Sequence, residues 1–450
     1  MLGWLTGAVY FTGTLYWITH VMATYGNLPR WIAVPINGAL IGYLSLFPAT
    51  FALVSARLIR RFGTLGVMAA PIVWVASEVG RTQVFTGFPW VLLGYSQTSV
   101  LPVAQLASLV GVYGVSLLVA AVSAAVVTAF NRRFRTVVPL ACVLAVVLVS
   151  ATWGSRRVAA RPWTREGDPI RIGLVQGNVD QAIKWDPGSA ANIFQDYIRY
   201  TRRAIFEGAQ LVLWPESSTP FMFEEDAAGA MQLRTLARQA GVTLLFGSDQ
   251  IERGTPMRYY NSAFVIRPDG TTAGVYRKMH LVPFGEYVPL QQLLFFAAPL
   301  TEQVGTFSPG MRPELLPVDG HRTSVAICYE VIYPALVRSF VTEGSELLTT
   351  ITNDAWFGTT SAPYQHFEQA AMRAIESGRY LVRAANTGIS GIVDPYGRVL
   401  SRTEIFQPAV LVGEARFLKA STFYVRHGDL VAYGSVVFTL ILLVVPARRV

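Results

Sequence analysis

Charged residues are scarce in this chain, and acidic residues are almost missing from its first third. Only 14% of the 450 residues are charged, whereas roughly a quarter is usual in a soluble domain. The chain has 28 acids, yet Glu78 is the only one before Arg156. This composition argues against a purely soluble protein, and it excludes a disordered chain, a collagen and a coiled coil. The uneven charge predicts that the first part lies in lipid and the later part in water.

Cysteine, histidine and lysine are rare as well. Two cysteines, Cys142 in an apolar run and Cys328 in the later part, cannot build a disulfide framework or a cysteine-rich metal site. The five histidines show no ligand spacing, so we expect no metal and no cofactor. Lysine occurs only at Lys184, Lys278 and Lys419, although the formal net charge is +9. Each lysine is therefore a candidate for a specific role.

Long apolar runs, by contrast, are abundant. Runs of spanning length occur at about residues 3–20, 32–56, 64–80, 107–130, 137–153 and 430–445. They predict a helical membrane bundle over residues 1–155, with about five spans, and a C-terminal spanning helix over residues 429–446. The first run has no basic segment before it and further spans after it, which favours a spanning helix over a signal peptide.

Arginine clusters predict the orientation of these spans. The clusters follow the second, fourth and sixth runs: Arg57, Arg60 and Arg61; Arg132, Arg133 and Arg135; Arg448 and Arg449. All three fall on one side if every run spans once, and the positive-inside rule makes that side cytoplasmic. We therefore expect residues 156–428 to lie outside the cytoplasm. A fourth cluster, which begins at Arg156, disagrees; it either contacts anionic headgroups or, as we favour, is tolerated before a large translocated domain.

Glu78 lies near the end of the third apolar run, where an isolated charge is costly. It needs a partner such as Arg81, or a water-filled cavity. We favour a structural ion pair at the interface over a catalytic role.

From Ile170 onward, short β-branched or apolar runs alternate with helical stretches. The runs predict strands with their turns at residues 170–179, 209–217, 242–248, 260–270, 323–330, 346–354 and 388–397. Helices are predicted at residues 189–206, 228–239 and 365–384. Alternation of this kind indicates an α/β domain with buried strands, here over residues 165–425.

Three residues with chemical potential stand at the ends of such strands: Glu216 in LWPES, Lys278 in YRKMH and Cys328 in VAICYE. Active groups collect at the carboxyl ends of strands in open α/β sheets, so we expect them to converge. A thiol is mostly protonated at neutral pH, and Glu216 is placed to accept its proton. Lys278 would then hold the carboxylate and stabilise an oxyanion. Singly, a cysteine in an apolar strand is usually core packing and a lysine is usually a surface group; the combination favours chemistry.

Longer motifs around these residues resemble a known family. In the first part they are LYWITH (15–20), LFPA (46–49) and TGFPWVLLGYSQ (86–97); in the later part they are VQGNVDQAIKWDP (175–187), WPES (214–217), RKMHLVPFGEYVP (277–289), CYE (328–330), NDAWFG (353–358) and RAANTGIS (383–390). Nearly the whole chain is similar to the bacterial apolipoprotein N-acyltransferases, the membrane-bound branch of the nitrilase superfamily. The resemblance implies a nitrilase-like αββα sandwich with a catalytic Glu216, Lys278 and Cys328 triad. Family members usually carry eight membrane helices, and this chain begins at what resembles the third.

The resemblance also implies supporting residues. Glu286 in PFGEYVP matches a second essential glutamate, and Trp185, Tyr329 and Glu330 match other residues that matter in the family. Independently of the family, the N–H of Tyr329 directly follows the nucleophile and suits an oxyanion hole. Glu330 either holds the turn or takes part in the chemistry, and Trp185 either forms a lid or fills a core. Phe284 and the apolar residues 293–296 either guide acyl chains or serve as core and interfacial anchors.

The resemblance implies a two-step acyl transfer, completing lipoprotein maturation in the bacterial inner membrane. A phospholipid donates an acyl chain to Cys328, and the α-amine of a diacylglyceryl-cysteine apolipoprotein takes it from the thioester. The expected partners are these two substrates and the bilayer, with no nucleic acid; we expect a monomer whose catalytic domain faces the periplasm. Two rivals are a membrane-tethered amidase acting on small amides and a transporter or scaffold with an inactive nitrilase domain. Many apolar runs weigh against the first, and the complete triad weighs against the second.

Overall fold

The computed structural model describes residues 1–131, 136–287 and 307–446, and the chain divides into two compact units. Unit 1 comprises Met1–Arg161 and Ser421–Val450, and unit 2 comprises Pro162–Ala420. Some residues singled out from the sequence lie outside the described residues: Arg132, Arg133, Arg135, the apolar residues 293–296, Arg448 and Arg449.

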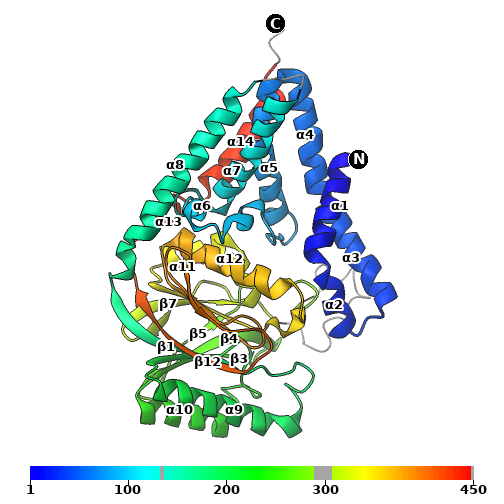
Figure 1. Cartoon of the computed structure of the whole chain (residues 1–450). Coiled ribbons are helices and arrows are strands. Elements are labelled where there is room, and N and C mark those ends of the chain that lie inside the picture. The colour runs from blue at the N-terminus through cyan, green and yellow to red at the C-terminus, as the bar shows by residue number, and fades with distance from the viewer. Residues whose placement is uncertain (132–135, 288–306, 447–450) are drawn as a thin grey trace. The chain divides into compact units, whose positions relative to one another are not determined.

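Unit 1 is built of helices (Figure 1). They are α1 (Leu2–Leu15), α2 (Trp17–Thr24), α3 (Arg30–Leu44), α4 (Leu46–Phe62), α5 (Thr64–Gln83), η1 (Leu93–Gln97), α6 (Leu101–Ala104), α7 (Ala107–Phe130), α8 (Val138–Ala160), α13 (Phe423–His427) and α14 (Leu430–Val444). Helix α5 packs against α4, α7 and α14, so the C-terminal helix joins the helices of the first third of the chain. The segment between α5 and η1, residues 84–92, is irregular.

Among the described residues, three stretches are long and apolar enough to cross a membrane: Arg30–Phe62, Ala107–Phe130 and Val138–Thr164. The six spans expected from the sequence are therefore reproduced only in part. The first apolar run is interrupted at Tyr16, which leaves helices of 14 and 8 residues, and α14 has 15 residues. Helix α5 has 20 residues, but Glu78, Arg81 and Gln83 lie in its last turns and lower its hydropathy.

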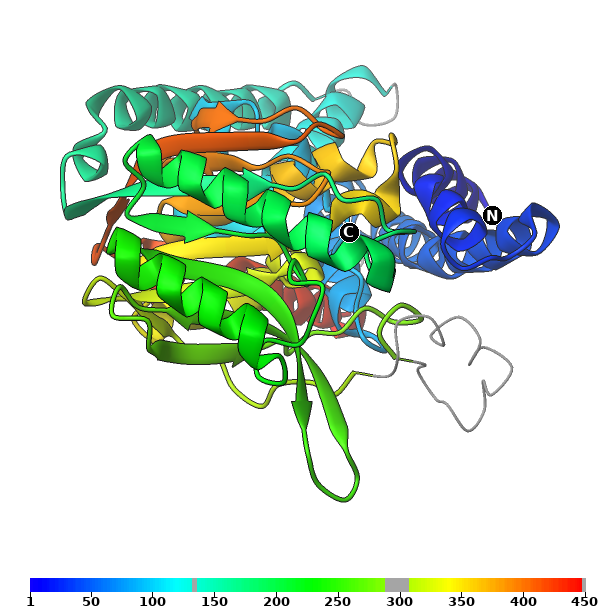
Figure 2. The same ribbon diagram turned by 90° about the horizontal axis from the view of Figure 1, so that it is seen from below.

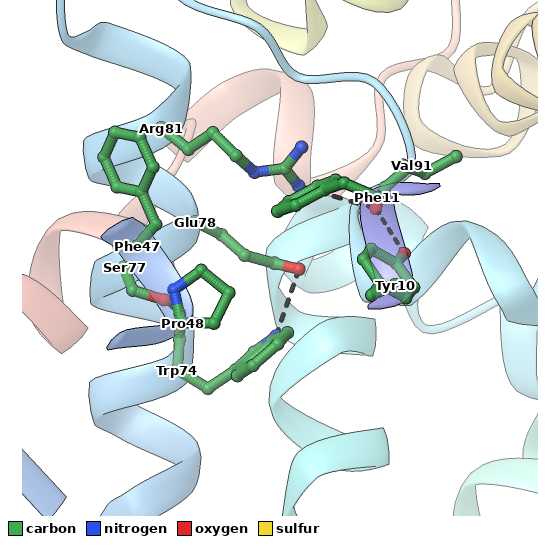
Figure 3. Close-up of a pocket in the computed structure, with 9 residues that line it drawn as sticks. All are labelled: Tyr10, Phe11, Phe47, Pro48, Trp74, Ser77, Glu78, Arg81 and Val91. Carbon is green, nitrogen blue, oxygen red and sulfur yellow. Dashed lines mark hydrogen bonds between the residues drawn. The ribbon is translucent and has the colours of Figure 1, made fainter. Parts of the chain in front are cut away.

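Glu78 is buried in unit 1, and Figure 3 shows the small pocket that its side chain lines. The carboxylate Oε1 accepts hydrogen bonds from Trp74 Nε1 at 3.1 Å and from the backbone N of Leu93 at 2.7 Å. Arg81 donates instead to loop carbonyls, among them that of Trp90 at 2.6 Å. In the described part of the chain, no ion pair within 4.0 Å joins Glu78 to Arg81. The expected ion pair with Arg81 is thus wrong in detail. The carboxylate of Glu78 is bound by the N–H groups of Trp74 and Leu93, and Arg81 binds carbonyl groups of the loop that leads to Leu93.

Unit 2 is a sandwich of four layers (Figures 1 and 2). One sheet has the order β12-β1-β2-β3-β4-β5 and the other the order β11-β10-β9-β8-β7-β6. Helices α9 and α10 cover the first sheet, and α11 and α12 cover the second. The bounds are β1 (Asp168–Gln176), α9 (Pro187–Phe206), β2 (Leu211–Leu213), α10 (Ala227–Ala240), β3 (Thr243–Glu252), β4 (Arg258–Ile266), β5 (Thr272–Arg277), β6 (Leu316–Val318), β7 (His321–Ile327), η4 (Cys328–Ile332), α11 (Pro334–Thr342), β8 (Leu347–Thr352), η5 (Asp354–Phe357), α12 (Ala362–Ser377), β9 (Leu381–Ala385), β10 (Gly391–Val393), β11 (Val399–Arg402) and β12 (Ala409–Phe417), after a short η2 (Pro162–Thr164).

Helix α9 shows how the outer layers form. Asp186 caps its N-terminus by accepting a hydrogen bond from the backbone N of Gly188, which satisfies a donor that the helix itself cannot. Its apolar residues recur at helical spacing, and Ile193, Tyr197 and Ile198 are buried in one cluster with the strands of the first sheet. Helix α10 is capped in the same way by Asp226 and belongs to the same cluster.

The third predicted helix, at residues 365–384, is wrong in its C-terminal part. Helix α12 ends at Ser377, and Gly378 follows in the left-handed conformation, with φ +63°. Glycine adopts this conformation without the steric cost that other residues meet, so it ends the helix. Residues Leu381–Ala385 form the central strand β9, parallel to β8. A continuous helix there would have removed the strand that carries Arg383.

Candidate active site

Strand ends from both sheets bring the site together in unit 2. Glu216 follows β2, Lys278 directly follows β5, and Cys328 directly follows β7. Strand β5 is antiparallel to β4, which is antiparallel to β3, so β5 ends at the same edge of the sheet as β2. The side chains of Glu216 and Lys278 meet at that edge, with 3.1 Å between Lys278 Nζ and Glu216 Oε1.

Glu216 is a buried carboxylate with a donor on each oxygen. Its Oε1 accepts from Asn261 Nδ2 at 2.7 Å as well as from Lys278, and its Oε2 accepts from the backbone N of Asn353 at 2.9 Å. Burial by itself would raise the pKa of Glu216, but the ammonium of Lys278 and the hydrogen bond from Asn261 hold it below its usual range. Glu216 is therefore ionised and ready to accept a proton.

Lys278 lies between two carboxylates. Its Nζ donates to Glu286 Oε1 at 2.9 Å in addition to Glu216, and Asn261 Nδ2 donates to the same Glu286 oxygen at 2.9 Å. Burial alone would lower the pKa of Lys278, but Glu216 and Glu286 together hold it well above its usual range. The second oxygen of Glu286 accepts from the backbone N of Val282 at 2.8 Å. The ammonium is thus permanently charged and fixed in position by both acids.

Cys328 begins the one-turn helix η4 at the end of β7, and its backbone is in the left-handed region, with φ +52°. A residue with a Cβ rarely adopts this conformation, and such strain is common at functional sites. Burial raises the pKa of the Cys328 thiol, and the carboxylate of Glu216 raises it further, while the ammonium of Lys278 opposes both. The resting group is therefore a thiol, which must lose its proton as it attacks. The charged neighbours that shift its pKa include the base that can accept this proton.

Glu330 holds the turn around Cys328. Its Oε2 accepts from the backbone N of Ile327 at 2.7 Å, and its Oε1 accepts from Tyr276 Oη and from the backbone N of Met279, both at 2.7 Å. Burial raises the pKa of Glu330 to about 7, and these hydrogen bonds oppose the rise. The carboxylate joins the turn that carries the thiol to the segment directly after Lys278.

The comparisons with known proteins match most of the chain. The carbon-nitrogen hydrolase family matches residues 171–417, and the apolipoprotein N-acyltransferase N-terminal domain matches residues 1–125. The apolipoprotein N-acyltransferase of Geobacter metallireducens is 40% identical over 459 residues, which cover 100% of this chain and 87% of that protein. The one of Methylococcus capsulatus is 35% identical and covers 96% of this chain and 85% of its own. This chain belongs to the apolipoprotein N-acyltransferase family.

Among solved structures, an amidase from Nesterenkonia sp. aligns with 56% of this chain and 93% of its own, at 25% identity and a TM-score of 0.43. The family matches and the two sheets of unit 2 confirm the predicted nitrilase-like fold class. They also confirm the predicted family and the enzyme class, an acyltransferase of the apolipoprotein N-acyltransferase family.

The other residues that the resemblance assigned lie in different surroundings. Tyr329 is buried, and its ring packs edge-on against Tyr333 with 5.3 Å between the ring centroids. Trp185 is 47% exposed, so the alternative that it fills a core is wrong. Glu286 belongs to the charged cluster through its contacts with Lys278 and Asn261. In the part of the chain that the structure describes, no group of three or more His, Cys, Asp or Glu residues forms a metal site.

Four residues of the candidate site were not assigned a role from the sequence. Asn261 Nδ2 and the backbone N of Asn353 donate to Glu216, and nothing in the local sequence of β4, RYYNSAFVI, marked Asn261. His366 donates to the backbone of Cys328, but a lone histidine on a helix gives no sign of this in the sequence. Lys184 is buried; burial lowers its pKa, and the charges of Asp249 and Glu216 act on it in the opposite sense. The scarcity of lysine marked Lys184 without indicating its role.

Proposed function

We propose that this chain transfers an acyl chain from a membrane phospholipid, through a thioester at Cys328, to the N-terminal α-amine of a diacylglyceryl-cysteine apolipoprotein. The observation that carries the proposal is the buried pair of Glu216 and Lys278, whose charges act on the thiol of Cys328. The names of the relatives supply the substrate class. The apolar helices of unit 1 agree with it, because a membrane enzyme meets lipid-anchored substrates on one surface, which lowers the entropic cost of encounter.

In the first half-reaction, Sγ of Cys328 bonds to the carbonyl carbon of the phospholipid ester while its proton moves to Glu216. The ammonium of Lys278 and the N–H of Tyr329 stabilise the oxyanion that forms. The ester C–O bond then breaks, and the departing alkoxide takes the proton from Glu216. The products are a thioester on Cys328 and a free lysophospholipid.

In the second half-reaction, the α-amine of the apolipoprotein attacks the thioester carbonyl, and Glu216 accepts a proton from the amine nitrogen. The C–S bond breaks, an amide forms, and the thiolate of Cys328 recovers a proton from Glu216. The same base therefore serves both halves, and the same donors stabilise both oxyanions. A base positioned in this way contributes a rate factor on the order of 10² to 10⁴.

The proposal includes a location. The arginine clusters favour an orientation in the bacterial inner membrane with unit 2 on the periplasmic side, where lipid-modified apolipoproteins present their amines. Trp185 fits a role at the entrance of the site, because half of its surface is exposed while the neighbouring Lys184 is buried. The amidase alternative would keep the same charged cluster but would not need the apolar helices of unit 1.

The test is acyl-enzyme formation from phospholipid. Purified protein is incubated with phospholipid that carries a labelled acyl chain, and we expect a hydroxylamine-sensitive label on Cys328, located by mass spectrometry. Addition of a diacylglyceryl lipopeptide with a free amine should move the label to that amine. Cys328→Ala should take up no label, and Cys142→Ser, which changes the other cysteine, should behave like the wild type. Label on Cys142, or turnover of small amides without phospholipid labelling, would contradict the proposal.

A further inference from the structure

A fully buried network lies on the backbone side of Cys328, apart from the cluster of Glu216, Lys278 and Glu286. His366 on α12 donates from Nε2 to the carbonyl oxygen of Cys328 at 3.1 Å. Its Nδ1 lies 3.0 Å from Asp354 Oδ1, and Nη2 of Arg383 lies 2.8 Å from Asp354 Oδ2 and 3.0 Å from His366 Nδ1. The side chains of all three are 0% exposed. Removing charged side chains from water costs free energy even when they are paired, so packing alone does not account for this network.

One hydrogen bond shows that Nε2 of His366 carries a proton. A carbonyl oxygen only accepts, so Nε2 must carry a hydrogen. Burial lowers the pKa of His366 and the Arg383 guanidinium lowers it further, whereas the carboxylate of Asp354 acts in the opposite sense. Burial would raise the pKa of Asp354, but the guanidinium of Arg383 holds it well below its usual range. Asp354 and Arg383 both lie against Nδ1, so together they fix the ring orientation in which Nε2 donates to Cys328.

The bond from His366 has a consequence one residue further along the chain. The carbonyl of Cys328 and the N–H of Tyr329 belong to one planar trans peptide unit, so they point in opposite directions. Holding the oxygen toward His366 therefore aims the N–H away from it. A hydrogen bond to the carbonyl also polarises the peptide and strengthens its N–H as a donor. Glu330 accepts from the backbone N of Ile327, in the Ala326–Ile327 peptide, so the backbone is also held just before the strained residue Cys328.

We propose that His366 is a positioning residue that orients and polarises the Tyr329 N–H as the oxyanion donor for acyl transfer, with Asp354 and Arg383 holding its ring in place. The inference deepens the proposed function and rests on it. His366 does not touch the substrate in this scheme; it acts through the peptide that does. The loss of one oxyanion donor usually lowers the rate on the order of 10² to 10³.

The test compares two reactions of Cys328 in a Cys142→Ser background. Acylation by a p-nitrophenyl ester forms an oxyanion, whereas alkylation by iodoacetamide is a displacement at carbon that forms none. His366→Leu should slow acylation about 10²-fold or more while alkylation of Cys328 stays within a few fold. His366→Gln, which can place an amide N–H near the position of Nε2, should acylate at least about tenfold faster than His366→Asn, which cannot. Ile375→Val, a buried apolar change on the same helix, controls for loosened packing.

Each result either supports or overturns the proposed role of His366. Equal losses in acylation and alkylation, or unchanged acylation in His366→Leu, would overturn the inference. If His366→Leu does not fold, equal acylation by the Gln and Asn variants would overturn it instead. Labelled phospholipid is tested in a parallel reaction: a wild type that reacts with the activated ester but not with phospholipid would refute the proposed function and leave the role of His366 to be decided by the ester.

Discussion

At the scale of single residues, the site is a buried cluster whose charges determine one another's protonation. Glu216 and Glu286 share the ammonium of Lys278 and the amide of Asn261, all within 3.1 Å. Burial by itself would raise the pKa of Glu216, and the ammonium of Lys278 opposes that rise. The cluster therefore keeps the carboxylate of Glu216 ionised in a buried place, where a lone acid would take up a proton.

Lys278→Met tests this dependence. Without the ammonium, acylation from phospholipid should fall on the order of 10² to 10³ through lost oxyanion stabilisation. The pKa of Glu216 should also rise, since Lys278 is a main cause of its depression. Glu216 acts in its ionised form, so the acidic limb of the pH–rate profile of residual acylation should move to higher pH. Lys419→Met, at a side chain that is 80% exposed, is the matched control. A normal rate and an unmoved acidic limb in Lys278→Met would show that the three residues are not one catalytic unit.

How far the residues could be predicted depended on their chemistry. Glu216, Lys278 and Cys328 were recognisable because each follows a strand and because lysine and cysteine are rare in this chain. Asn261 and His366 were not, because an amide in a strand and a histidine on a helix acquire their roles only from partners 45 and 38 residues away. Their geometry is a property of the folded sandwich and leaves no local pattern.

At the scale of elements, the segment between β1 and α9 is held to the site by asparagines. Asn386 accepts from the backbone N of Val179 at 2.9 Å, donates to the oxygen of Val179 at 2.8 Å, and donates to Asn353 Oδ1 at 3.0 Å. Asn353 in turn donates to Gln181 at 2.7 Å. This chain of hydrogen bonds fixes the segment that carries Lys184 and Trp185.

Asn386→Ala should release that segment. It removes three hydrogen bonds and leaves partly buried backbone groups of Val179 without their Asn386 partner, which costs about 2 to 3 kcal/mol. In a unit of this size we expect the melting temperature to fall by roughly 5 to 10 °C. The measurement is a thermal melt in detergent, with Asn192→Ala on the exposed face of α9 as control. A melting temperature within a degree or two of the wild type would show that the asparagines do not carry this tether.

Helices and strands were predictable where one face is apolar and the other is polar, because the apolar residues then recur at a regular spacing in the sequence. The amphipathic helices α9 and α10 appear within two residues of their predicted bounds, because each has a polar face and an aspartate cap. Strand β9 was absorbed into a predicted helix, since LVRAA is buried throughout and shows no alternation. Short edge strands such as β6 and β11 pair with only one neighbour and carry little pattern of their own.

At the scale of the whole molecule, composition predicted the contrast between an apolar helical part and a mixed α/β part. Within unit 1, helix α4 also contacts the C-terminal helix α14, because Arg61 Nη1 donates to the carbonyl oxygen of Leu443 at 3.0 Å. The arginine cluster in the last turns of α4 therefore lies at the same end of unit 1 as the last turn of α14. Asn131, the residue directly after α7, is exposed.

The orientation of the chain can be tested with single cysteines in a Cys142→Ser background, where Cys328 is buried. If the arginine clusters lie in the cytoplasm, Asn131→Cys should react with an impermeant maleimide only after permeabilisation of spheroplasts. Gln239→Cys, on the exposed face of α10 in unit 2, should react in intact spheroplasts. Both positions are accessible in the folded chain, so a difference in labelling reports the membrane and not burial. The reverse pattern would place the charged cluster of Glu216, Lys278 and Glu286 in the cytoplasm, away from apolipoproteins whose amines are presented on the periplasmic surface, and the proposed acceptor would then have to be abandoned.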